Sequence, residues 1–369
     1  MISDNIFGQL FEDKFKNIFN TNKSKETQYI RLVSIENFLN KEKFNGFNSE
    51  DLFIMQFIKK GWGQDIAALS HMAESLVNLS IKYPLEVKYK NLVKKVVMRS
   101  VHPKVNPYKK DINSIQNLGK YGYYLEHLNI ILGCYQRVLD NKYLKLNTKI
   151  SHHLLQSSLS NNDFHADLLP YVKMKWSADQ AAIIYSLWLF DKNNQTDISF
   201  DLKNKWISYM NKNCVHLKTG LYQTEVLGVK KYSKEPRGCA LSYLIHYMGR
   251  FDHKVALNQW ELYKHHMLIN VLGRTGFREY LSSYEGGWTP DSGPIIGGVG
   301  IAATGLGLNA SSTMNDKKTY KKLERGMKMV FSLFMKGDSI PGVNKLTKIG
   351  TDLLASSIWL NAETKEKWY

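Results

Sequence analysis

The chain has 369 residues, 43% of them hydrophobic, which allows a sizeable core and excludes a disordered segment. Its formal net charge is +17, but the lysines are spread along the sequence without a nucleic-acid recognition motif, so we expect no specific nucleic-acid partner. Three cysteines, Cys134, Cys214 and Cys239, lie far apart, which predicts neither a disulfide framework nor a zinc cluster and favours the cytoplasm.

The first sixty residues precede a repeating region and form an N-terminal helical extension in our interpretation. Residues 1–16 lack the basic and apolar regions of a signal peptide. Residues 30–39 have the pattern of a helix, which we expect to lie over the rest of the molecule as an accessory element. The remaining residues, 61–369, are predicted to form one large domain.

A turn marked by Gly, Trp or Pro recurs six times in residues 61–369, each time before an apolar run. The last residues of these turns follow one another at intervals of 58, 56, 60, 54 and 59 positions, and they are Asp65, Tyr123, Asp179, Cys239, Gly293 and Asp352. A regular period of this length is typical of a repeat architecture. The sequence therefore predicts six units of about equal size.

Each unit has room for two helices, because apolar residues recur at spacings of three and four, not in alternation. The first helix of each pair is the more apolar, and the second is the more charged. Inner helices that pack on all sides and outer helices that face water would produce this difference. We therefore predict an all-α (α/α)6 toroid, with helices at 66–81, 87–101, 124–139, 144–159, 180–190, 202–214, 240–249 and 253–272.

The run from Trp288 to Leu308 is rich in glycine and small apolar residues. Gly298-Val-Gly300-Ile-Ala-Ala303 formally matches a dinucleotide-binding pattern, but no buried strand precedes it. The run is long enough to cross a membrane, yet it has few large apolar side chains and no second span accompanies it. We therefore expect a tightly packed fifth inner helix that starts at Pro294, with Asp291 or Ser292 as its N-cap.

If the recurring turns begin the inner helices, their side chains converge at one end of the toroid. Aromatic walls with a few acidic groups suit a neutral or hydroxylated small molecule. The predicted catalytic carboxylates are Asp65, Asp179 and Asp291, although each of them, like Asp352, could instead be a helix N-cap. The predicted substrate-binding residues are Trp62, Tyr123, Tyr124, Trp176, Glu235, Arg237 and Trp288.

His127 and Arg237 complete the predicted set. His127 could shuttle protons one turn into the second inner helix, or it could be a packed core histidine. Arg237 could anchor an anionic group, but an ion pair with Glu235 or with one of the aspartates is the simpler interpretation. Because no H-x-x-x-H or Cys/His cluster occurs, we expect no metal site, and we regard His71 and His246 as lining or structural residues.

Four segments together resemble the linalool dehydratase/isomerase-like family of (α/α)6 proteins, which is related in architecture to six-hairpin glycosidases. They are Gly122-Tyr-Tyr-Leu-Glu-His-Leu-Asn129, Trp176-Ser-Ala-Asp-Gln180, Pro236-Arg-Gly-Cys-Ala-Leu-Ser242 and Asp291-Ser-Gly-Pro294. The resemblance spans about residues 60–360. It implies a central pocket, with His127 as a pocket histidine and Asp65 as an early pocket acid.

The characterised enzyme of that family adds or removes water and shifts a double bond on a terpene alcohol without a cofactor. It also relies on a cysteine pair near the third hairpin, where this chain has Trp176, Ser177 and Asp179. We therefore expect a cofactor-independent lyase or isomerase that uses acid–base chemistry on a hydroxylated, terpenoid-like molecule. The alternatives are a carbohydrate-active hydrolase with paired carboxylates and a non-catalytic binding scaffold. The expected partner is a small molecule, and self-association stays open.

Overall fold

The fold was determined as a computed structural model. It describes residues 23–52, 55, 63–226, 235–271, 273–281, 286–287, 289, 291–335 and 352–369, without the side chains of 23–30 and 330–335. No helix in these ranges is both long and apolar enough to span a membrane.

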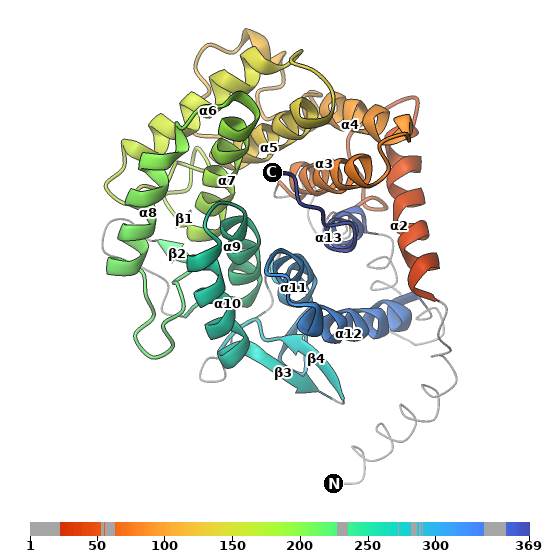
Figure 1. Ribbon diagram of the computed structural model, residues 1–369, viewed down its shortest axis with the longest axis vertical. Helices are drawn as coiled ribbons and strands as arrows, with labels where there is room; N and C mark the ends of the chain where they lie inside the picture. Colours follow the sequence, from red (N-terminus) through yellow and green to blue (C-terminus); the bar gives the residue numbers. More distant parts are fainter. Residues whose placement is uncertain are drawn as a thin grey trace.

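Six inner helices form a closed ring, which confirms the predicted (α/α)6 toroid. Each contacts the next one in the chain, and the last contacts the first (Figure 1). The inner helices are α3 (Gln64–Lys82), α5 (Gly122–Val138), α7 (Ser177–Asn194), α9 (Gly238–Phe251), α11 (Ile301–Thr313) and α13 (Leu353–Glu363). They begin within a few residues of the predicted positions, except α11.

The outer layer packs against this ring with one face of each helix. In α4, for example, Val93, Val96 and Val97 are buried, whereas Val87 and Met98 are exposed. A helix with one apolar face is what a ring exposed to water on its outside requires. The outer helices are α4 (Val87–Ser100), α6 (Leu144–Leu159), α8 (Ser199–Asn213), α10 (His253–Met267) and α12 (Lys317–Met335).

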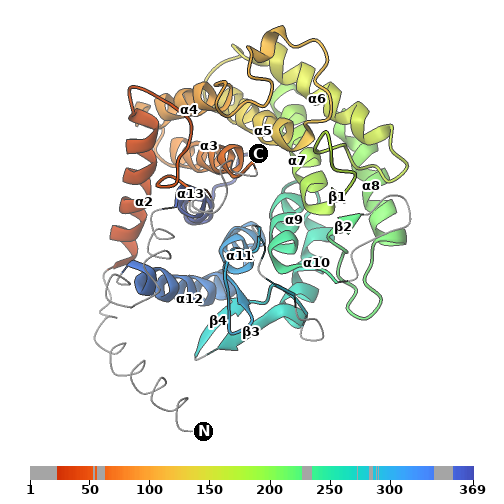
Figure 2. The ribbon, with the colours of Figure 1, turned by 180° about the vertical axis from the view of Figure 1, so that it is seen from behind.

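Helix α2 (Lys23–Asn40) joins the outer layer from the N-terminal end of the chain. It packs against α13 and α4, so the last inner helix receives its outer partner from the start of the sequence (Figure 2). Ile35 is fully buried in this contact region, and Arg31 forms an ion pair with Glu363. The boundary expected at residue 60 stays a prediction, because residues 56–62 lie outside the described part.

The predicted start of the fifth inner helix at Pro294 is wrong. Strands β5 (Ile295–Ile296) and β6 (Val299–Gly300) form an antiparallel hairpin there, and α11 begins only at Ile301. Gly297 and Gly298 turn the hairpin with φ values of 57° and 82°, a conformation that glycine adopts without steric cost. Crowding does explain Gly307, because a Cβ there would lie 2.8 Å from the ring of Phe277.

Two short strand pairs and a 3-10 turn were not part of the all-helical prediction. The helix expected to reach residue 272 ends at Met267, because β3 (Leu268–Val271) pairs with β4 (Arg274–Phe277). Strand β1 (Lys175–Trp176) pairs with β2 (Glu225–Val226), which ties the start of α7 to the segment before α9. A 3-10 turn, η2 (Ile112–Ser114), lies between α4 and α5.

Candidate functional site

Tyr123 marks the place where the predicted acidic groups converge. It lies at the start of α5, and its ring packs so closely on Gly63 that a Cβ there would be 2.2 Å from the Cε1 atom of Tyr123. Burial raises the pKa of Tyr123 well above 10, and four carboxyl groups raise it further: Asp179, Glu126, Asp291 and Asp65. The N-terminal ends of the inner helices therefore surround one acidic site, as the sequence predicted.

Asp179 has the properties expected of a proton donor. It lies in the first turn of α7, where Trp176 takes the N-cap position, so Asp179 is not the cap of this helix. Burial raises its pKa to about 7, and the neighbouring Asp291 charge acts in the same direction. A carboxyl group with a pKa of about 7 is about half protonated at neutral pH and can act as a general acid.

Glu126 is a member of the site that the sequence reasoning did not assign. It is fully buried, and neither of its carboxylate oxygens accepts a hydrogen bond from the described residues. Burial and the adjacent Asp179 raise its pKa well above 4.5, which favours the protonated form of Glu126. The only sequence signal was a glutamate one helical turn after Tyr123 within an apolar run.

Of the other predicted aspartates, Asp65 and Asp291 lie near Tyr123, whereas Asp352 is a helix N-cap. Burial raises the pKa of Asp65 to about 6, and its Oδ1 accepts a hydrogen bond from the Ile66 backbone at 2.8 Å, while Gly63 holds the N-cap position. Asp291 is exposed, and although partial burial raises its pKa, Arg237 acts in the opposite direction. Asp352 caps α13 by accepting from the Ala355 backbone, which confirms its capping role.

His127 lies beneath the site and does not reach its surface. It is fully buried, and its Nε2 atom is 3.1 Å from the hydroxyl of Tyr243, which comes from α9. Burial lowers the pKa of His127 to about 3, so the imidazole is neutral at ordinary pH. The structure therefore favours the packed-histidine interpretation over the proton shuttle.

The predicted binding residues have different environments. Tyr124 is buried and donates a hydrogen bond to the Ser100 carbonyl, so it supports the core and does not face a ligand. Trp176 is half-buried beside the site in β1, and Glu235 lies 3.8 Å from His216. Trp62 and Trp288 lie outside the described residues.

Arg237 forms an ion pair, but with a residue that the sequence reasoning did not name. Its Nε donates to Glu279 Oε1 at 3.1 Å, and another guanidinium nitrogen donates to Thr289. Glu279 is fully buried and also accepts from the Cys239 backbone. Arg237 therefore holds the start of α9 against the segment that leads to Asp291.

One group of described residues has the spacing of a metal site. His71, Glu74 and His246 offer ligand atoms within 4.8 Å of one another. However, Tyr185 and Asn361 already donate hydrogen bonds to the two oxygens of Glu74, and the nearby cation Lys365 opposes a second positive charge. We interpret the group as a buried polar network, in keeping with the expectation of no metal.

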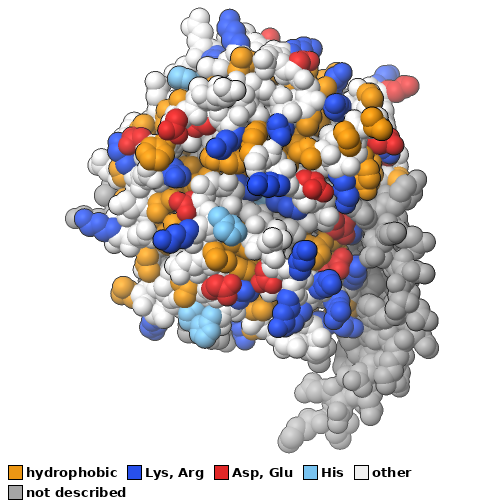
Figure 3. All heavy atoms as spheres, viewed as in Figure 1, with side chains coloured by type: hydrophobic (Ala, Val, Ile, Leu, Met, Phe, Trp, Pro, Cys, Tyr) orange, Lys and Arg blue, Asp and Glu red, His pale blue; other side chains and the backbone are white. Residues whose placement is uncertain are grey.

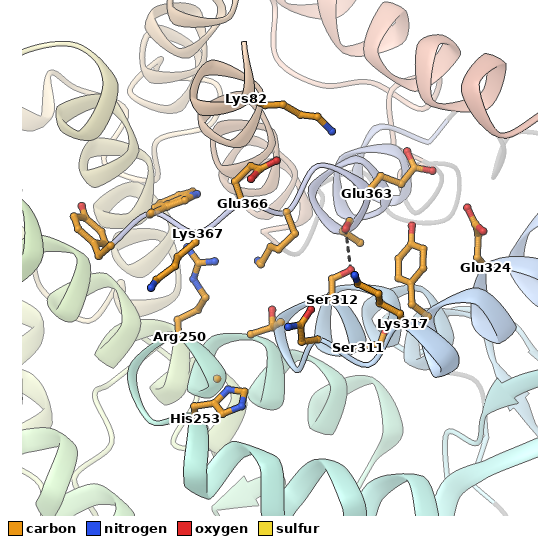
Figure 4. Close-up of a pocket in the computed structure, with 18 of the residues that line it drawn as sticks. Lys82, Arg250, His253, Ser311, Ser312, Lys317, Glu324, Glu363, Glu366 and Lys367 are labelled. Atoms are coloured by element: carbon orange, nitrogen blue, oxygen red, sulfur yellow. Dashed lines mark hydrogen bonds between the residues drawn. The ribbon is translucent and has the colours of Figure 1, made fainter. Parts of the chain in front are cut away.

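An open pocket of about 950 Å³ lies at the opposite end of the ring from Tyr123. The C-terminal ends of inner helices form it, and Figure 4 shows Arg250 from α9 near Ser311 and Ser312 from α11. Ser312 donates a hydrogen bond to the Ala362 carbonyl, which joins α11 to α13 beside the pocket. The sequence reasoning did not predict this pocket.

No family model and no curated protein matches the chain. Solved structures with a similar fold include a family 76 glycoside hydrolase from Bacteroides thetaiotaomicron, with a TM-score of 0.56 and 10% identity over 91% of this chain and 77% of that one. An unsaturated glucuronyl hydrolase specific for heparin has a TM-score of 0.58 at 11% identity, over 92% of this chain and 95% of that one.

A third similar structure is an inactive variant of an α-1,6-mannanase from a Salegentibacter species in complex with α-1,6-mannotetrose. Its TM-score is 0.53 at 12% identity, and the match covers 92% of this chain and 98% of that one. At such low identities the likeness concerns the fold alone. The chain is a six-hairpin (α/α)6 toroid of the kind found in these glycosidases.

Proposed function

We propose that the chain is a carbohydrate-active hydrolase whose active site surrounds Tyr123. The observation that carries the proposal is the environment of Asp179, a buried carboxyl group with a pKa of about 7 beside a second carboxyl group at the protein surface, Asp291. Hydrolysis of a glycosidic bond requires this division, in which one carboxyl group is protonated and another is ionised. The fold shared with glycosidases supports the same reading.

In the proposed reaction, Asp179 donates its proton to the glycosidic oxygen as the bond from that oxygen to the anomeric carbon breaks. Asp291, whose ionised form Arg237 stabilises, either removes a proton from the attacking water or attacks the anomeric carbon itself. Water supplies the hydroxyl group of the product. Tyr123 offers an aromatic surface for a sugar ring, and Glu126 acts as a positioning residue behind Asp179.

The same groups would also serve a lyase or isomerase acting on a terpenoid alcohol. The comparisons favour the hydrolase, because the similar structures named above are carbohydrate-active enzymes. The substrate of the mannanase is not carried over to this chain. Its inactive variant lacks two adjacent aspartates, and the sequence here contains no Asp-Asp pair.

The test is an activity screen of the full chain with oligosaccharides, aryl glycosides and unsaturated uronides, with terpenoid alcohols as the competing class. Asp179→Asn and Asp291→Asn should each lower the rate of hydrolysis by about 10²–10⁴-fold, because each removes one acid–base group. Asp352→Asn is the matched control, since asparagine also caps helices and the rate should stay near that of the wild type. Turnover of a terpenoid alcohol without glycoside hydrolysis would overturn the proposal.

A further inference from the structure

Arg250 and Lys365 lie together in the pocket at the far end of the ring from Tyr123. Both side chains line it, and the charge of Arg250 is among the effects that lower the pKa of Lys365. Within the part of the chain that the structure describes, neither cation has a carboxylate within ion-pair distance. Two adjacent cations without a counter-ion are a costly arrangement in a protein interior.

The guanidinium of Arg250 is held in place by aromatic rings. Its central carbon lies 4.7 Å from the ring centroid of Trp368 and 5.6 Å from that of Tyr185. Stacking of this kind engages the face of a guanidinium and leaves the N–H groups at its edge available. Arg250 is therefore fixed as a donor that can bind an oxyanion through two parallel hydrogen bonds.

Lys365 follows α13 by two residues and is enclosed by protein. Burial, together with the charge of Arg250, lowers its pKa to about 7, and the charge of Glu74 only partly offsets these two effects. The carbonyl ends of α9, α11 and α13 favour cations here and explain in part why basic residues gather. These carbonyl groups do not fully stabilise the charged form of Lys365, since its pKa is still lowered.

The rest of the lining adds positive charge. Two of its three glutamates already have partners outside the pocket, Glu363 with Arg31 and Glu324 with Lys328. Figure 3, in the same orientation as Figure 1, shows lysine and arginine side chains around the middle of this face. The further basic residues that line the pocket are Lys82, Lys317, Lys321 and Lys367.

We propose that this pocket binds a small anion with a phosphate, sulfate or carboxylate group, held by Arg250 and Lys365. The anion would supply the missing counter-charge. The volume of about 950 Å³ leaves room for an organic portion beside the aromatic residues Trp188, Tyr320 and Trp368. This site is separate from the proposed catalytic site and does not depend on it.

The test is a thermal-shift and calorimetric titration of the full chain with inorganic phosphate, sulfate and citrate at constant ionic strength, with chloride as the reference. We expect saturable binding of at least one of these anions, accompanied by a rise in melting temperature. Arg250→Gln and Lys365→Met should each weaken that binding at least tenfold. Lys94→Met is the matched control, because Lys94 is an exposed lysine of the outer helix α4 that does not line the pocket, and its loss should change binding less than twofold.

A second readout does not require binding by the variants. Lys365→Met should raise the melting temperature of the anion-free protein, because it removes an uncompensated buried charge. The proposal is overturned if no anion binds saturably, if both pocket variants bind like the wild type, or if Lys94→Met weakens binding as much as Lys365→Met. The Lys365→Met variant should hydrolyse glycosides at the rate of the wild type, because the pocket is separate from the proposed catalytic site. This measurement tests the proposed function independently of anion binding.

Discussion

Glu126 on α5 and Asp179 on α7 interact electrostatically: burial and the charge of Asp179 raise the pKa of Glu126, and Glu126 acts to lower the pKa of Asp179. Glu126 is fully buried, whereas Asp179 retains partial exposure, so only Asp179 can meet a substrate. Their relationship links the packing of α5 against α7 to the protonation of the proposed acid.

The first prediction concerns the pH profile of hydrolysis. Because Asp179 acts in its protonated form, activity should fall as pH rises through about 7. Glu126 acts to lower the pKa of Asp179, so in Glu126→Leu the loss of activity should move to higher pH by about one unit. Glu126→Gln keeps an N–H donor at the same place, and its profile should stay close to that of the wild type. The test is to measure kcat for both variants from pH 5 to 9. If activity falls at the same pH in Glu126→Leu and Glu126→Gln, the interaction between Glu126 and Asp179 is contradicted.

A second prediction concerns stability at the same residue. The folded pKa of Asp179 is about 7 and its ordinary value is 3.8, so the folded state binds the proton more tightly and stability falls as pH rises between these values. Asp179→Asn removes this penalty and should raise the free energy of unfolding at pH 8 by roughly 1–2 kcal/mol while activity is lost. Urea unfolding at pH 4 and pH 8 measures the difference, which should shrink at pH 4. A variant that is less stable than the wild type at pH 8 would count against the assignment.

Gly63 supports Tyr123 and should not tolerate a side chain. Its φ is 81°, and a Cβ would collide with the Tyr123 ring. We expect Gly63→Ala to cost about 2–3 kcal/mol in the free energy of unfolding and to lower activity by displacing Tyr123. Gly287→Ala is the control, because a Cβ there meets nothing within 4 Å. Equal unfolding midpoints for the two variants would show that the contact is not restrictive.

The ion pair between Arg237 and Glu279 gives the fourth prediction. Arg237→Gln leaves the fully buried Glu279 charge without its cation and should destabilise the fold by about 3–5 kcal/mol. The double variant with Glu279→Gln should recover part of this loss, because the uncompensated charge is gone. Lys205→Gln, which breaks an exposed pair with Asp201, should change the unfolding free energy by less than about 1 kcal/mol in the same assay. A double variant no more stable than the single one would contradict this account.

The sequence by itself determined the period and therefore the fold. The spacing of the six turns placed the inner helices other than α11 within a few residues, because a repeated apolar run must be buried against its neighbours wherever it occurs. It also placed Asp65, Asp179 and Asp291 at one end of the ring, since equivalent positions of parallel repeats lie side by side. The repeat spacing did not predict the local backbone conformation at Gly297 and Gly298, which turn a hairpin where a helix was expected.

Only the tertiary structure decided which polar residues act alone and which have partners. Position in the repeat could not separate Asp352, a cap, from Asp179, whose pKa depends on burial beside residues from other helices. Nor could it join Glu126 to Asp179, Arg237 to Glu279, or Arg250 to Lys365. Each of these relationships depends on distances between segments far apart in the chain, and electrostatic energies change steeply with such distances and with the exclusion of water.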